Sequence, residues 1–223
     1  LAPYVLARIG VFLRDGNQID QSVPWFNEII ERPGIESKDY AYNALAKIHL
    51  KALNASEQEK GLKYVDWVVN NSSNTQLQRE SAYERASYYS RKNQWPNAEK
   101  YWTEFVKNKK WTGTFSAEAW YRLGESMEKN NKTSEALSPY TNLLAKYASR
   151  IEYSIPAVAS SASIQKNLGK NAEAYKLAHR SGLKFANYLN DRRFSQEFAT
   201  LKRIYYELSD EHVGENDKDP FVN

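Results

Sequence analysis

The histidines are the first side chains to test for chemistry, because imidazole is a common general base and metal ligand near neutral pH. The chain has three, His49, His179 and His212, and no two of them have the spacing that puts two ligands on one helix face. It has no cysteine, which excludes disulfide and zinc–thiolate sites. We therefore interpret His49 as a residue packed between helices, and we expect no metal ion and no cofactor.

The other candidates for catalysis are serines, a glycine-lysine pair and carboxylates. The serines within residues 160–163 have no histidine pattern nearby to activate them. Gly169-Lys170 lacks the preceding glycines that a phosphate-binding loop needs. Glu118, Glu125 and Glu128 have the spacing of one solvated helix face. No group of residues has the pattern of a catalytic site, so the sequence predicts a protein that is not an enzyme.

Charge and hydropathy argue against nucleic acid and membrane as partners. The 223 residues include 31 basic and 27 acidic side chains, a net charge of +4. Basic residues such as Lys107, Lys109 and Lys110 gather near expected helix ends, where they complement the helix dipole. They do not form a basic stripe interleaved with aromatic side chains, as nucleic-acid binding favours. The longest apolar stretch, residues 4–13, contains Arg8 and is too short to cross a bilayer.

The elements that position these side chains are helices. Apolar residues recur at spacings of three and four in residues 119–127 and again in residues 136–147. The polar segment 129–133 separates the two runs. Glycine and proline are scarce, with nine and seven residues, and the alternation typical of half-buried strands is absent. Residues 119–147 therefore predict a helical hairpin.

The hairpin pattern repeats along the chain. Small residues recur in the first helix of each hairpin at intervals of 36, 40, 38 and 38, at Gly10, Ala46, Ala86, Gly124 and Ala162. A second small residue follows in the partner helix, at Ser22, Gly61, Ala98, Ala136 and Ala174. Large residues follow four positions later in four of the repeats, at Phe26, Val65, Trp102 and Tyr140. Small residues let two helices approach closely, and stacking of successive hairpins supplies the core that one hairpin lacks.

The best-preserved repeat resembles a tetratricopeptide repeat at six signature positions, Trp120, Leu123, Gly124, Met127, Ala136 and Tyr140. The resemblance covers roughly residues 3–186, with a period longer than the family's ~34 residues. In composition the chain is similar to the divergent repeats of bacterial extracytoplasmic tetratricopeptide proteins. The resemblance implies an all-α fold, a right-handed α-α superhelix (TPR-like solenoid) of about five helical hairpins plus a C-terminal capping helix.

Boundary signals divide the chain further. Residues 192–208 have helical apolar spacing and predict the capping helix, so we expect a single repeat domain over residues 1–208. Residues 209–223 are polar and net acidic, and predict a tail or a linker. The chain begins with leucine instead of methionine, which indicates a processed or trimmed piece.

Local signals predict where several helices begin. We expect first-turn prolines at Pro3, Pro96 and Pro156. We also expect capping boxes over residues 56–59 and 73–76, each opened by a serine.

The resemblance also implies a binding site, because the first helices of tetratricopeptide repeats line a concave groove. The repeat register places eight partner-binding candidates there, Tyr40, Asn43, Lys47, Tyr83, Arg91, Tyr121, Glu125 and Lys129. Tyrosine offers a large, stiff contact area with a hydroxyl group, as binding hot spots do. The alternative is that the tyrosine rings pack between neighbouring hairpins as ordinary core.

Some family members grip the C-terminal carboxylate of heat-shock chaperones with a fixed set of groove lysines, asparagines and an arginine. Here Ala7, Val11 and Ala44 stand at positions of that set, and Glu80 and Glu118 replace expected cations. We therefore expect a protein or peptide partner of another kind.

Two functions remain open at this point. The first is a non-enzymatic protein-interaction module that binds a peptide or protein segment in its groove. The alternative is a structural spacer or scaffold segment of a larger protein, with no ligand of its own. A carbohydrate surface or an enzyme built on Trp95 and Trp111 is a third and less favoured hypothesis. The compartment is unknown, although the lack of cysteine and the sequons at Asn54, Asn70, Asn71 and Asn131 favour a periplasmic or secreted protein over a cytoplasmic one.

Overall fold

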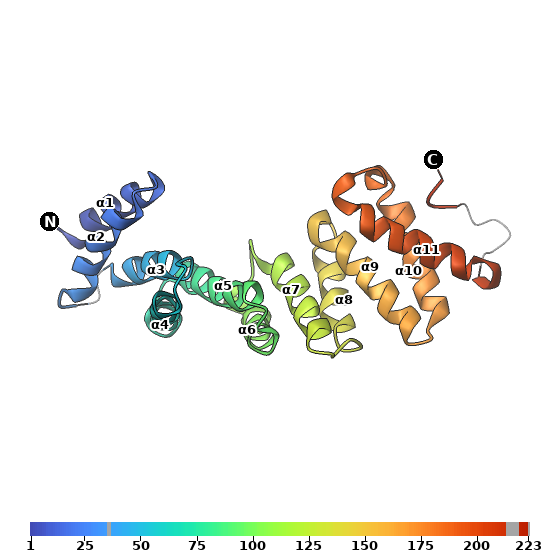
Figure 1. The fold of residues 1–223 in the computed structure, drawn as a ribbon, viewed down its shortest axis with the longest axis horizontal. Coiled ribbons are helices and arrows are strands. Elements are labelled where there is room, and N and C mark those ends of the chain that lie inside the picture. Colours follow the sequence, from blue (N-terminus) through green and yellow to red (C-terminus); the bar gives the residue numbers. More distant parts are fainter. Residues whose placement is uncertain (35–36, 213–218, 223) are drawn as a thin grey trace. The chain divides into compact units, whose positions relative to one another are not determined.

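The computed structural model describes residues 1–34, 37–212 and 219–222, and all regular structure in them is helical (Figure 1). The α-helices are α1 (Pro3–Asp15), α2 (Ile19–Glu31), α3 (Lys38–His49), α4 (Ala55–Asn71), α5 (Thr75–Arg91), α6 (Trp95–Lys107), α7 (Ser116–Lys129), α8 (Leu137–Lys146), α9 (Ile151–Asn167), α10 (Asn171–Lys184) and α11 (Ser195–His212). Short 3₁₀ helices are η1 (Lys109–Trp111), η2 (Ala186–Tyr188) and η3 (Arg192–Phe194). The predicted all-α fold is confirmed.

The chain divides into two compact units, Leu1–Gly113 and Thr114–Asn223. The first unit contains three helical hairpins, α1–α2, α3–α4 and α5–α6, followed by η1. The second contains the hairpins α7–α8 and α9–α10, and α11 packs on both α9 and α10. The described residues thus confirm five hairpins and a further helix. A single domain over residues 1–208 stays a prediction.

The small residues of the repeat register form the centre of each hairpin. All ten of them are buried, five in the first helices and five in their partners. Gly10 lies against the ring of Phe26, and Gly124 lies against the ring of Tyr140. Trp102 fills the corresponding place in the α5–α6 hairpin and is fully buried. The predicted packing of a small residue against a large one is therefore present in the α1–α2 and α7–α8 hairpins, whereas Gly61 lies against Leu50.

An arginine joins three helices of the first unit. Arg85 on α5 is buried, and its guanidinium reaches Asp66 on α4 at 2.6 Å and Glu104 on α6 at 2.8 Å. The same group lies 4.1 Å from the ring centroid of Tyr101. One planar cation thus fixes α5 between its neighbours, which a lysine with its single point charge could not do equally well.

Two helix starts differ from the predicted capping boxes. Asparagines, not serines, cap α4 and α5. The side chain of Asn54 accepts a hydrogen bond from the backbone N–H of Glu57, and that of Asn74 accepts from Gln76 and Leu77. Each asparagine lies directly before the first helical residue, where its short acceptor reaches the unpaired N–H groups of the first turn. The prediction of capping boxes over residues 56–59 and 73–76 is therefore wrong.

Two of the three predicted first-turn prolines lie at helix starts, and the third does not. Pro3 and Pro96 lie in the first turns of α1 and α6, as predicted. Pro156 does not start a helix, because α9 already begins at Ile151. Ile155 is fully buried there, and its packing favours an earlier start at the cost of one backbone hydrogen bond at the proline.

Part of the segment predicted as a polar tail belongs to the folded unit. Residues 209–212 continue α11. Phe221 is buried in the core of the second unit, where its ring lies 5.6 Å from that of Tyr205 and next to Gly182 on α10. Pro220 is also buried against Gly182, and the Tyr206 hydroxyl donates a hydrogen bond to Asp219 Oδ2 at 2.9 Å. The rest of the predicted tail, residues 213–218 and 223, lies outside the described residues.

Candidate interaction groove

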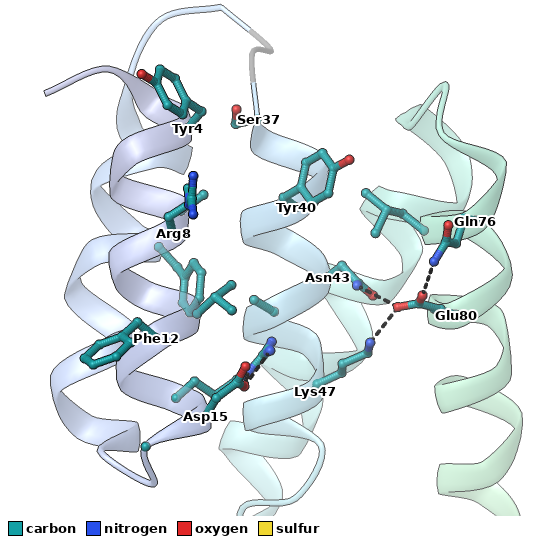
Figure 2. A pocket seen from close by; sticks show the side chains of 17 residues that line it. Tyr4, Arg8, Phe12, Asp15, Ser37, Tyr40, Asn43, Lys47, Gln76 and Glu80 are labelled. Atoms are coloured by element: carbon teal, nitrogen blue, oxygen red, sulfur yellow. Dashed lines mark hydrogen bonds and ion pairs between the residues drawn. The ribbon is translucent and has the colours of Figure 1, made fainter.

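The first helices of the three hairpins in the first unit line a groove of about 990 Å³. Figure 2 shows side chains of α1, α3 and α5 around it. Phe26 and Ala44 belong to its wall and to the buried core beneath it, so the groove is built on the same packing that holds the hairpins together. The repeat register also placed the predicted groove on first helices, and its partner-binding role stays a prediction.

The polar part of the groove is a hydrogen-bonded network centred on Glu80 of α5 (Figure 2). Lys47 Nζ and Asn43 Nδ2, both on α3, donate to Glu80 Oε2 at 2.7 and 3.3 Å. Gln76 Nε2 donates to Glu80 Oε1 at 3.1 Å. Ser81 Oγ in turn donates to Asn43 Oδ1 at 2.9 Å. The network ties α3 to α5 and fixes the orientation of its side chains.

The network also sets the acidity of Glu80. Partial burial raises the pKa of this carboxyl, but the hydrogen bonds from Lys47, Gln76 and Asn43 favour its charged form and lower the pKa below the usual 4.5. Glu80 is therefore ionised at neutral pH. A carboxylate held by a lysine is a weak proton acceptor, so the network is suited to positioning and not to general-base catalysis.

The apolar part of the groove includes three exposed aromatic rings. Tyr4 and Phe12 on α1 are 58% and 77% exposed, and Tyr40 on α3 is 53% exposed. Arg8 lies between Tyr4 and Phe12 at helical spacings of four, which puts the three side chains along one face of α1 (Figure 2). The Tyr40 hydroxyl accepts a hydrogen bond from Asn74 Nδ2 at 3.3 Å.

Three of the eight predicted site residues, Tyr40, Asn43 and Lys47, meet in this groove. Tyr83 is in the same unit, but its half-buried ring packs edge-on against Trp102 and Phe105 at centroid distances of 5.6 and 6.5 Å. Both of these rings belong to α6, so Tyr83 packs on the partner helix of its own hairpin. Arg91 is exposed at the end of α5 and does not line the groove.

The other three predicted residues lie on α7 in the second unit. Tyr121 is half-buried, with the rings of Tyr140 and Tyr153 both at 6.0 Å. Burial, reinforced by the charge of Glu125, raises the pKa of Tyr121 to about 12. Glu125 itself is paired with Arg122 at 2.9 Å.

Lys129 is exposed at the last turn of α7. A partner-binding role for all eight residues stays a prediction.

The repeat register missed Arg8 and Phe12. It selected positions three and six residues before each small anchor and one after it, whereas Arg8 lies two residues before Gly10. The spacing of Tyr4, Arg8 and Phe12 was the available signal, since it places two aromatic rings and a cation on one helix face.

His49 has the role that its position predicted. Its Nδ1 lies 2.6 Å from Glu57 Oε2 of α4, and its ring lies 5.4 Å from that of Tyr64. The side chain is thus packed between the two helices of one hairpin.

Taken together, stacked hairpins with small-residue contacts define an all-α helical-repeat protein. Residues 118–149, which span most of α7 and all of α8, match the family model of the tetratricopeptide repeat. The predicted tetratricopeptide repeat is thereby confirmed. No curated protein matches the chain. Tetratricopeptide repeats in general serve as protein-interaction modules and are typically non-catalytic.

The search for membrane spans gives a separate finding. Within the part of the chain that the structure describes, no helix combines the length and the apolar character needed to cross a bilayer.

Proposed function

We propose that the chain is a non-enzymatic interaction module whose groove over α1, α3 and α5 binds a peptide or protein segment. The observation that carries the proposal is that three exposed rings, Tyr4, Phe12 and Tyr40, line the same groove as a preformed polar network. Solvent-exposed aromatic side chains gathered at a concave surface are typical of protein-binding sites.

The geometry supplies both affinity and orientation. Covering the exposed rings removes apolar surface from water, which is worth about 25 cal/mol per Å². The Glu80 network is already hydrogen-bonded without a partner, so little side-chain entropy is lost there on binding. Polar groups of a bound segment would find donors and acceptors in fixed positions at the network. The partner in this proposal is a protein, with no cofactor and no nucleic acid.

Selection from a phage-displayed library of random peptides tests the proposal. The wild-type chain is expected to enrich binding peptides, and Tyr40→Ala is expected to lose most of them. Tyr206→Ala is a matched control, because Tyr206 on α11 is similarly exposed at 49% but lies in the second unit. Enriched peptides that bind wild type and Tyr40→Ala equally, or no enrichment at all, would favour the spacer hypothesis instead.

A further inference from the structure

Arg8 is the groove cation that has no carboxylate of its own. Arg14 is paired with Asp15 at 2.8 Å, and Lys47 is paired with Glu80 at 2.7 Å. Arg8 lines the groove and is exposed, and its guanidinium makes no ion pair or hydrogen bond within the described residues 1–34, 37–212 and 219–222. Among the described residues that line the groove, the charged groups therefore leave one positive charge, at Arg8.

The surroundings of Arg8 restrict what can satisfy it. Tyr4 and Phe12, one helical turn to either side, present exposed rings (Figure 2). A group that reaches the guanidinium therefore lies next to apolar surface on both sides. Guanidinium binds carboxylate with two parallel hydrogen bonds, which fixes orientation as well as charge.

We propose that the segment bound in the groove carries a side-chain carboxylate, aspartate or glutamate, flanked by apolar side chains. The carboxylate pairs with Arg8, and the apolar side chains cover Tyr4 and Phe12. The inference rests on the proposed function and names the chemistry of its partner. Lys47 does not compete for the carboxylate, because Glu80 already neutralises it.

The phage selection described above tests this inference when the peptides are displayed with their C-termini fused. Only side-chain carboxylates are then offered. Peptides enriched on the wild-type chain are expected to contain aspartate or glutamate next to apolar residues. Selection on Arg8→Glu is expected to enrich lysine or arginine at that place.

Arg180→Glu is the matched control. Arg180 on α10 is also exposed and also without an ion pair among the described residues, and its reversal changes the net charge equally. Arg180→Glu is expected to select the same peptides as wild type. Circular dichroism of both variants checks that helix content is unchanged, as expected for exposed positions.

Affinities of synthetic peptides make the test quantitative. Replacing the acidic residue of an enriched peptide with its amide is expected to weaken binding to wild type up to about fivefold, the range of an exposed ion pair. The same replacement is expected to have no effect on binding to Arg8→Ala.

The two proposals fail in different ways. Two results would overturn the carboxylate inference and leave the groove as a binding site. In the first, the enriched peptides require Tyr40 but contain no preferred acidic residue. In the second, selection on Arg8→Glu enriches the same acidic residue as selection on wild type. Peptides that bind without Tyr40 would overturn both.

Discussion

Gly124 and Tyr140 are in such close contact that a Cβ at residue 124 would lie well inside van der Waals distance of Cε1 of the tyrosine ring. The ring of Tyr140 therefore fills the space that a side chain at residue 124 would need. Gly10 has the same relationship to Phe26 in the α1–α2 hairpin, with the corresponding distance at 2.8 Å. Both pairs join a small anchor to the large residue that the repeat register assigned to it.

Gly124→Ala is expected to destabilise the protein by about 1–3 kcal/mol, because the added methyl group forces the buried ring of Tyr140 to move. The loss is expected although alanine is favoured over glycine inside helices by about 1 kcal/mol. Urea unfolding followed by circular dichroism measures it.

Tyr140→Leu provides the check on this explanation. In the double variant the smaller side chain leaves room for the methyl group, so the two losses are expected to be less than additive. A Gly124→Ala chain as stable as wild type would contradict the steric account.

Tyr83 and Tyr40 are expected to respond differently to truncation. Tyr83→Ala removes a ring that packs on Trp102 and Phe105, and is expected to cost about 2 kcal/mol or more of unfolding free energy. Tyr40→Ala removes an exposed ring and is expected to change stability by less than about 0.5 kcal/mol. Thermal unfolding measures both variants. If Tyr40→Ala loses as much stability as Tyr83→Ala, Tyr40 is also a core residue and does not belong to the binding groove.

Glu80 is expected to make stability depend on pH. The pKa of Glu80 is lower in the folded chain than the ordinary 4.5 of the unfolded chain. Its contribution to the free energy of unfolding is therefore complete above pH 4.5 and is lost as the pH falls through the folded-state pKa. Glu80→Gln is expected to cost up to about 1 kcal/mol at neutral pH and to flatten the fall in stability on the acid side of 4.5.

Urea unfolding over a series of pH values measures this effect. Glu59→Gln is the control, since Glu59 forms an exposed pair with Lys63 on α4, and little change is expected there. An acid profile of Glu80→Gln that is parallel to that of wild type would show that the network does not favour the charged carboxylate.

Tyr121 is expected to ionise late in an alkaline titration. Burial, together with the charge of Glu125, raises its pKa from 10.0 to about 12 in the folded chain. Stability linked to this group is therefore complete below pH 10 and is lost as pH rises toward 12. Ultraviolet absorbance of tyrosinate is expected to show one late-ionising tyrosine fewer in Tyr121→Phe. If wild type and Tyr121→Phe have the same number of late-ionising tyrosines, Tyr121 is exposed to solvent, as its predicted partner-binding role requires.

The core could be predicted from sequence because close packing leaves a strict pattern. Gly10, Gly124, Phe26 and Tyr140 are selected by steric requirements between two helices that are near in sequence. Residue type and spacing are sufficient to find such contacts.

The groove could be predicted only in part, because the register gives a helix face and not its exposure. Two of the positions six residues before the anchor, Tyr4 and Tyr40, are exposed, whereas Glu80 and Glu118 at the same register position are half-buried. Positions three before it, Tyr83 and Tyr121, lie one turn closer to the hairpin contact and pack against Trp102 and Tyr140. Both of these rings come from the partner helix of the hairpin, Trp102 from α6 and Tyr140 from α8.

Photo-crosslinking tests the central claim most directly. A benzophenone amino acid replaces Tyr40 in one chain and Tyr206 in another, and each chain is irradiated with a peptide enriched on wild type. The account predicts a crosslinked product from residue 40 and none from residue 206. Crosslinking from residue 206, or none from residue 40 while the peptide still binds, would contradict a binding site in the groove of α1, α3 and α5.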